Sequence, residues 1–264
     1  MVYKLIIVLA VFGSACRAQT RDTIIDLHSQ FKDFRGAFVL FDQQRQLYSR
    51  YNPLQCAERF SPASTFKIPN SLIGLETGVI RDQHFIIPWD SVKRSIPEWN
   101  RDHDLQSAIR VSAVWYYQEL ARRVGRERMK HWMDTLGYGN GDISGGIDRF
   151  WLGSSLLISA NEQVEFLRRL HRDDLPFSRR SMQIVKEILV LEKTDSYVLQ
   201  GKTGFSTNSR GFVAGWFVGY IERGSNIYFF ASNIISENGT RDGDRIFKSR
   251  KEVALSVLRE LHLL

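Results

Sequence analysis

Segments with the patterning of β-strands lie at both ends of this chain, and its middle has the patterning of helices. Residues 36–41 and 46–49 flank the polar stretch Asp42-Gln43-Gln44-Arg45, which predicts a hairpin. Three antiparallel strands are predicted near the C-terminus, at residues 197–203, 211–220 and 226–231. Strands at both ends with helices between imply that the two ends pair into one sheet. We therefore predict an α+β fold, with a mainly antiparallel sheet built from both chain ends, helices packed on it, and a helical lobe inserted between.

Apolar residues recur at helical spacing through the middle of the chain, and glycines follow several of these segments. The predicted helices cover residues 68–77, 107–124, 126–136, 161–171 and 178–191, and a closing amphipathic helix covers 248–264. The chain has 264 residues, enough for a substantial core. We expect a single unit over residues 19–264, with a sheet subdomain at about 19–60 and 178–264 and a helical subdomain at about 61–177. A cleft is expected where the two subdomains meet.

The first eighteen residues read as a secretory signal peptide, with Lys4, an apolar run over residues 5–12 and small residues after it. Cleavage after Ala18 would leave a mature chain that begins at Gln19 and is periplasmic or secreted. Cleavage after Ala15 would instead expose Cys16 for a lipid anchor, but the preceding Gly-Ser-Ala matches that signal poorly. Loss of Cys16 leaves Cys56 alone, so no intramolecular disulfide is expected.

The absence of characteristic sequence patterns argues against several functional classes. No segment after the signal is long and apolar enough to be a membrane helix. The net charge of +7 comes from dispersed basic residues without interleaved aromatics, so no nucleic-acid partner is predicted, and no obligate protein partner is inferred. The histidines lack metal-ligand spacing, so no metal is expected, and the chain has neither a glycine-rich phosphate loop nor a Gly-x-Ser-x-Gly elbow.

Ser64 and Lys67 form the pattern Ser-x-x-Lys. Residues three apart on a helix are neighbours, so the hydroxyl and the amine can touch if Ser64 lies in the first turn of a helix. A serine hydroxyl needs an adjacent base, and a protonated lysine cannot be that base. Either burial lowers the pKa of Lys67, or the amine is converted chemically into another base. The alternative interpretation is an ordinary helix start, with Ser64 as the N-cap and Lys67 in solvent.

Further motifs follow Ser64 along the chain. They are Ser112-Ala113-Val114, Tyr138-Gly139-Asn140, Phe150-Trp151-Leu152-Gly153 and Lys202-Thr203-Gly204. Ser-x-x-Lys, a second serine motif and Lys-Thr-Gly occur in this order in serine β-lactamases and penicillin-binding proteins. Val114 stands where the commonest form of the second motif, Ser-Asp-Asn, has asparagine. Together with Trp151, these motifs resemble those of the class D β-lactamases, the oxacillinases. The resemblance extends from roughly Asp33 to the C-terminus.

This resemblance implies a chemical role for each motif. Ser64 would be the nucleophile, and Lys67 would be carboxylated by carbon dioxide or bicarbonate to a carbamate that acts as general base. No other cofactor is implied. Trp151 would donate its indole proton to the carbamate, and Ser112 would pass a proton to the departing lactam nitrogen. The backbone N–H groups of Ser64 and Phe205 would form the oxyanion hole.

The resemblance also implies residues that bind and shape the substrate site. Lys202, Thr203, Gly204 and Phe205 would bind the substrate, and Arg250 would assist with its carboxylate, with Arg245 as a nearby competitor. Val114 and Leu152 would provide apolar walls, and Tyr138 and Asn140 a supporting role at the cleft wall. Ordinary structural interpretations stay open for Ser112 as a helix serine, Trp151 as a core aromatic and Arg250 as a surface charge.

The function implied is hydrolysis of the β-lactam amide bond of penicillin-type antibiotics, which would confer antibiotic resistance. One alternative is a penicillin-sensing receptor domain that is acylated without fast turnover. Another is a transpeptidase-like penicillin-binding protein, which Val114 and Trp151 fit poorly. Penicillins, cephalosporins and carbapenems stay open as substrates, as does the oligomeric state.

Overall fold

The computed structural model describes residues 20–208, 211–238 and 240–264. The predictions of a signal peptide over residues 1–18 and of a lipid anchor at Cys16 lie outside these residues. Within the described ranges, no helix is long and apolar enough to cross a membrane.

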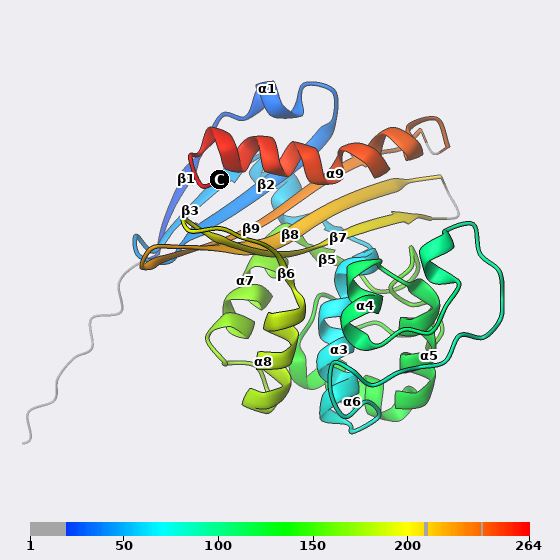
Figure 1. The fold of residues 1–264 in the computed structure, drawn as a ribbon. Helices are drawn as coiled ribbons and strands as arrows, with labels where there is room; N and C mark the ends of the chain where they lie inside the picture. Colours follow the sequence, from blue (N-terminus) through cyan, green and yellow to red (C-terminus); the bar gives the residue numbers. More distant parts are fainter. Residues whose placement is uncertain (1–19, 209–210, 239) are drawn as a thin grey trace, which may run out of the picture.

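A sheet of seven strands runs through the described part of the chain, in the order β1-β3-β2-β9-β8-β7-β6 (Figure 1). All neighbours in it are antiparallel except β1 and β3. The strands are β1 (Arg21–Ile24), β2 (Arg35–Asp42), β3 (Leu47–Tyr51), β6 (Val190–Lys193), β7 (Val198–Thr207), β8 (Val213–Arg223) and β9 (Asn226–Ser236). The predicted hairpin and the three predicted C-terminal strands are confirmed, and β1 and β6 were not predicted.

Pairing of β2 with β9 joins the two ends of the chain, as predicted, with Val39 opposite Ala231. Side chains of β2 alternate between two cores because successive residues of a strand face opposite ways. Phe38 and Leu40 belong to the core under the last helix, whereas Val39 and Phe41 belong to the larger core shared with the helical lobe. Both faces of the central sheet are therefore buried.

One face is covered by α9 (Thr240–Glu260) and the short α1 (His28–Phe31) (Figure 1). The prediction that the last helix begins at residue 248 was wrong, because α9 starts at Thr240. The first turns of α9 are polar, and a tertiary contact holds them on the sheet. Ile246 packs over Gly215 of β8, where an added Cβ would lie 2.7 Å from Ile246 Cγ2. Arg250 lies near the middle of this helix.

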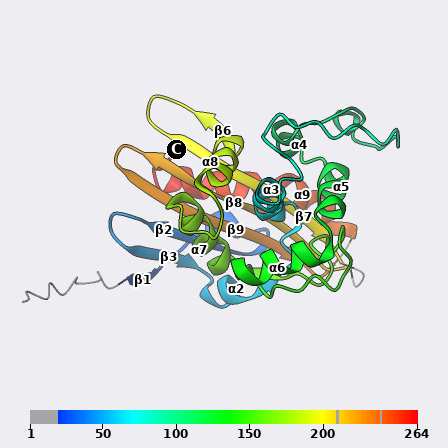
Figure 2. The ribbon, with the colours of Figure 1, turned by 90° about the horizontal axis from the view of Figure 1, so that it is seen from below.

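The helical lobe covers the opposite face (Figures 1 and 2). Its elements are α3 (Lys67–Glu76), η2 (Pro97–Trp99), α4 (Leu105–Arg110), α5 (Val114–Val124), α6 (Arg126–Leu136), α7 (Ala160–His171) and α8 (Arg179–Ile188). The connection into it contains α2 (Pro53–Ala57), β4 (Arg59–Phe60) and the 3-10 turn η1 (Ala63–Phe66), and β4 pairs with β5 (Ile158–Ser159). The predicted helices 68–77, 126–136 and 161–171 are confirmed.

Two helix predictions in the lobe were partly wrong. The segment 107–124 is two helices, because Ser112 adopts a left-handed backbone with φ 57° between α4 and α5. The segment 178–191 is helical only to Ile188, after which β6 pairs with β7. In both places a helical apolar pattern continues through a break that tertiary contacts impose.

Candidate active site

Ser64 lies in η1, directly before α3, at the junction of the sheet and the helical lobe. It is half-buried, and every other residue from Phe60 to Leu75 is buried. The preceding Ala63 has φ 49°, a left-handed conformation that is costly for a residue with a side chain. Ser64 is therefore the one partly exposed residue in an otherwise buried segment.

Lys67 is the first residue of α3, and its Nζ lies 2.6 Å from Ser64 Oγ. The predicted contact between hydroxyl and amine is present, although the serine precedes the α-helix in a 3-10 turn. The lysine is 0% exposed, which contradicts the interpretation of a solvated helix-start residue. Burial lowers its pKa well below the usual value, and the charge of Lys202 lowers it further. Burial thus favours the neutral amine, the form that can accept a proton from the serine.

Aromatic residues of α5 form part of the surroundings of this amine. The ring centroid of Tyr117 lies 5.3 Å from Lys67 Nζ, and the Tyr117 hydroxyl is hydrogen-bonded to Ser71 Oγ at 3.0 Å. Ser71 Oγ also donates to the Lys67 carbonyl at 2.7 Å. These bonds hold α5 against the first turn of α3.

Ser112 and Val114 lie where α5 begins. Val114 is its first residue, one helical turn before Tyr117, so the two share a face of α5. Ser112 is not within a helix: it lies in the break before α5, with the left-handed backbone already described. Strained residues of this kind cluster at functional sites.

Trp151 lies on the other side of the turn that carries Ser64. It is fully buried, and its ring stacks on Phe66 with centroids 5.3 Å apart. Ser61 Oγ donates to the Trp151 carbonyl at 2.9 Å and accepts from the Gly153 amide at 2.9 Å, which fastens this loop to the approach to Ser64. The indole Nε1 is buried and has no acceptor within the described residues. Leu152, next in the chain, is half-buried against the same core.

Strand β7 runs beside η1, which carries Ser64. A Cβ at Gly204 would lie 2.8 Å from the Pro62 carbonyl oxygen and 3.1 Å from Thr65 Cγ2, so glycine permits this close approach. The Gly201 amide points away from β8, because it donates to the Leu189 carbonyl at 3.0 Å. Amides of alternate residues point the same way, so the N–H groups of Thr203 and Phe205 face this outer edge of β7.

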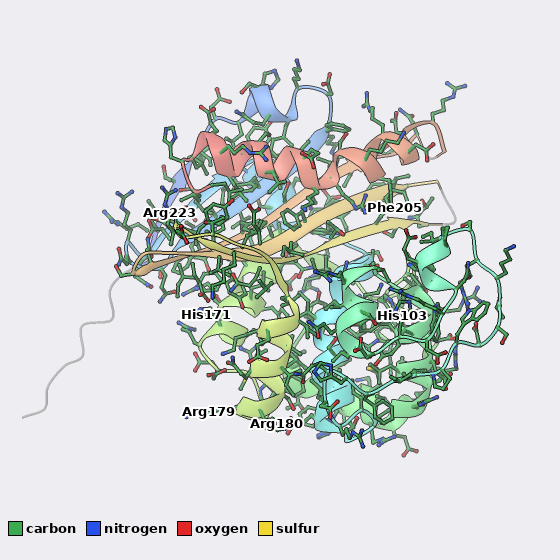
Figure 3. All side chains as sticks on the ribbon, viewed as in Figure 1. His103, His171, Arg179, Arg180, Phe205 and Arg223 are labelled. Atoms are coloured by element: carbon green, nitrogen blue, oxygen red, sulfur yellow. The ribbon has the colours of Figure 1, made fainter. Side chains whose placement is uncertain are left out.

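The outer edge of β7 is open next to Ser64. Strand β6 pairs with β7 only from Val198 to Gln200, so the described register leaves the edge from Lys202 to Thr207 without a strand neighbour. The side chain of Phe205 packs edge-on against Phe247 of α9, and Figure 3 shows it between that helix and the lobe that carries His103. Its backbone N–H faces the open edge, as inferred above from the Gly201 amide.

Two basic side chains, Lys202 and Arg250, lie near this edge. Lys202 is buried, with its Nζ 3.1 Å from the Thr203 carbonyl, and burial with the nearby charge of Arg250 lowers its pKa to about 7. Arg250 packs on Gly215, opposite Phe205 on β8, and burial lowers its pKa to about 10. Arg245 faces elsewhere: its Nη2 donates to the Asp33 carbonyl at 2.6 Å and its guanidinium stacks on Phe34. Arg250 is therefore the arginine beside Lys202, and it is not the surface charge of the alternative interpretation.

Comparison with known proteins agrees with this geometry. Residues 33–258 match the family model of the penicillin binding protein transpeptidase domain. A "Probable beta-lactamase YbxI" of Bacillus subtilis is 45% identical over 240 residues, which cover 91% of this chain and 86% of that protein. The crystal structure of a class D β-lactamase from Sebaldella termitidis is 34% identical and superposes with a TM-score of 0.88 over 94% of this chain and 100% of the other.

The chain belongs to the class D β-lactamases. It is a β-lactam hydrolase with the fold of that family, as the sequence motifs predicted. A third relative, the "Regulatory protein BlaR1" of Bacillus licheniformis, is 39% identical over 223 residues, which cover 84% of this chain and 36% of that protein.

The remaining motif residues lie behind the reactive groups of this class D enzyme. Tyr138 is buried edge-on against Phe66, and its hydroxyl donates to Gln163 at 3.3 Å. Asn140 joins the turn after α6 to the segment after Trp151: its amide nitrogen donates to the Ser155 carbonyl, and its Oδ1 accepts from the Leu157 amide.

Sequence reasoning missed Ser61, Tyr117 and Phe247. Ser61 anchors the Trp151 loop, Tyr117 faces Lys67, and the Phe247 ring lies 3.8 Å from the Arg250 guanidinium. Ser61 lies three residues before Ser64, but its partner is ninety residues away in the sequence. The other two lie on ordinary helical patterns that carry no signal of their contacts.

Proposed function

We propose that this enzyme opens the β-lactam ring of penicillin-type antibiotics through an acyl-enzyme on Ser64. The observation that carries this proposal is the 2.6 Å contact between Ser64 Oγ and a fully buried Lys67 Nζ, next to an open strand edge. The Ser64 oxygen adds to the lactam carbonyl as its proton moves to the base, and the C–N bond then breaks. Water hydrolyses the ester and regenerates Ser64.

Carboxylation of Lys67 by carbon dioxide fits the residues around it. The reaction needs a neutral amine, which burial of Lys67 favours. The buried indole N–H of Trp151, which lacks an acceptor in the described residues, supplies a donor of the kind a buried anion needs. The carbamate would supply a general base for both acylation and deacylation. Val114 and Leu152 would restrict water near this group.

The positions of further site residues support roles in proton transfer, oxyanion binding and substrate binding. Ser112, strained at the break before α5, would pass the proton to the leaving nitrogen. The amides of Ser64 and Phe205 would bind the oxyanion, since Phe205 N–H faces the open edge of β7 beside η1. Lys202, Thr203 and Arg250 would bind the substrate carboxylate by charge and hydrogen bonding.

A second candidate is a penicillin-sensing domain that stays acylated. The similarity to a regulatory protein, of whose length this chain spans about a third, is the observation that favours it. The two candidates differ in one rate, because a sensor is acylated at Ser64 and then hydrolyses the ester slowly.

The test is turnover of a penicillin by purified protein, with and without added bicarbonate. The enzyme should turn over many equivalents and gain activity from bicarbonate, and Ser64→Ala should lose all hydrolysis. Ser29→Ala, an exposed serine on α1 across the sheet, serves as the control and should behave as the parent. One equivalent of stable acyl-enzyme without turnover would favour the sensor. Activity that persists in Ser64→Ala would refute the nucleophile assignment.

Export is a further proposal. The segment 1–18 predicts a periplasmic or secreted enzyme whose mature chain begins at Gln19. N-terminal analysis of the protein from cells would test it, and a lipid-bearing Cys16 at the N-terminus would contradict it.

A further inference from the structure

A pocket of about 240 Å³ lies beside β7 at Gly201, Lys202 and Thr203, along the edge where the substrate is proposed to bind. Lys202 and Thr203 belong both to its lining and to the proposed carboxylate site. The other residues that line it come from α4, α8, the segment around β6, β7 and α9: Gln106, Ile109, Arg110, Glu187, Ile188, Val190, Leu191, Gly201 and Lys251.

The strand direction places this pocket in line with the reacting groups. Successive residues of a strand advance by roughly 3.3 Å, so Phe205, Thr203 and Gly201 are spaced about 6–7 Å apart along the same edge. In the proposed function Phe205 binds the acyl oxygen and Thr203 the carboxylate. At Gly201 the edge closes, because its amide is bonded to the Leu189 carbonyl before β6. A substituent next to the substrate carboxylate would therefore point to the pocket.

The lining is positively charged. Arg110, Lys202 and Lys251 provide three cationic side chains, and Glu187 is the acidic residue of the lining, hydrogen-bonded to Gln183 at 3.0 Å. None of the ion pairs between described side chains includes Arg110, Lys202 or Lys251. With Lys202 assigned to the substrate carboxylate, the charges of Arg110 and Lys251 are available to a second anionic group that enters from the substrate side.

Apolar side chains complete the walls. Ile109 and Ile188 are buried, and Val190 and Leu191 remain 43% and 46% exposed at the rim. A cavity of about 150 Å³ is sufficient for a benzene ring. The pocket thus combines room for an aromatic ring with cations for an acidic group.

We infer that this pocket is a subsite for an aromatic, anionic substituent on the ring carbon next to the one that bears the substrate carboxylate. The inference rests on the proposed function, which sets the substrate along β7. Cephalosporins carry a variable arm at this position, so the preferred substrate class would be cephalosporins whose arm ends in an acid.

The experiment uses two cephalosporins that differ only in the charge of this arm, a 4-carboxyphenylthio group and its neutral 4-carbamoylphenylthio counterpart. KM for the acid should be about three- to tenfold lower, as expected for partly exposed charges. High salt should abolish the difference because it screens such pairs. Dissociation constants measured with the Ser64→Ala variant should show the same preference without turnover.

Arg110→Gln and Lys251→Gln should each reduce the preference for the acid and leave kcat and KM for the neutral arm unchanged. Arg179→Gln is the charge-matched control: Arg179 begins α8, at the end of that helix remote from Phe205 in Figure 3. It should keep the parent preference. Equal KM and dissociation constants for both arms in an active enzyme would overturn the subsite and leave the proposed function intact. Tight, selective binding without hydrolysis of any β-lactam would support the subsite and overturn the proposed turnover.

Discussion

The site contains two buried lysines in contrasting surroundings. Lys67 begins α3, with the Ser64 hydroxyl at 2.6 Å and the Tyr117 ring at 5.3 Å from its Nζ. Lys202 lies on β7, donates to the Thr203 carbonyl at 3.1 Å, and has Arg250 as its charged neighbour. Burial is the main reason why the pKa of each is lowered, and no carboxylate contributes to either shift.

The comparison indicates that neighbours, and not residue type, would separate the proposed base from the proposed anion-binding cation. The pKa of Lys202 is about 7, so a large fraction stays charged at neutral pH, and this charge helps to keep Lys67 neutral. Lys67 faces a hydroxyl that can lose a proton. Lys202 lines a pocket beside β7 with Thr203, where an anionic substrate can lie. The different roles proposed for the two lysines follow from these surroundings.

The largest effect is expected from Lys67→Ala. Removal of the general base should lower the rate of hydrolysis by about 10²–10⁴-fold, with deacylation impaired at least as severely as acylation. Steady-state turnover and mass spectrometry of the acyl-enzyme would measure the two steps. Rapid turnover by the variant would mean that Lys67 is not the base.

Trp151→Phe should have an intermediate effect, because it removes the indole N–H and keeps an aromatic ring against Phe66. The carbamate of Lys67 should be less populated, and activity should fall by about tenfold or more and recover in part with bicarbonate. A carbon-13 spectrum of protein in labelled bicarbonate would report the modification directly.

The matched control for that variant is Trp132→Phe, in the same lobe, where Trp132 stacks on Phe177. Its carbamate signal should equal that of the parent. Absence of a carbamate signal from the active parent enzyme at every pH would show that Lys67 acts as a plain amine.

Arg250→Ala should affect the chemical step least and substrate binding most specifically. Loss of a charge-assisted hydrogen bond should raise KM for carboxylate-bearing substrates by about tenfold or more. Arg250 lowers the pKa of Lys202, so its removal should raise that pKa above about 7. Because the cation is lost as pH rises through its pKa, the alkaline rise in KM should move to higher pH in the variant.

The control is Arg245→Ala, which removes a cation bonded to the Asp33 carbonyl and stacked on Phe34, away from Lys202. KM and its pH dependence should match those of the parent. A large effect here, with none at Arg250, would transfer the carboxylate site to Arg245.

Local patterns in the sequence carried much of this description. Alternation and turn residues predicted β2, β3 and the strands β7 to β9, and glycine after an apolar repeat predicted the ends of α3 and α6. The spacing from Ser64 to Lys67 predicted their contact, because adjacent helical turns fix that geometry within a few residues. Motif order indicated the family.

Tertiary structure alone decided the properties that depend on distant partners. The split at Ser112 and the early start of α9 come from packing that no local repeat records. The same holds for the choice of Arg250 over Arg245, which depends on which face of α9 meets Gly215 on β8. The lowered pKa of Lys67 requires complete removal from water, and the side chains that exclude water come from segments far apart in the chain. Burial and charge are sums over neighbours in space, so only the folded chain determines them.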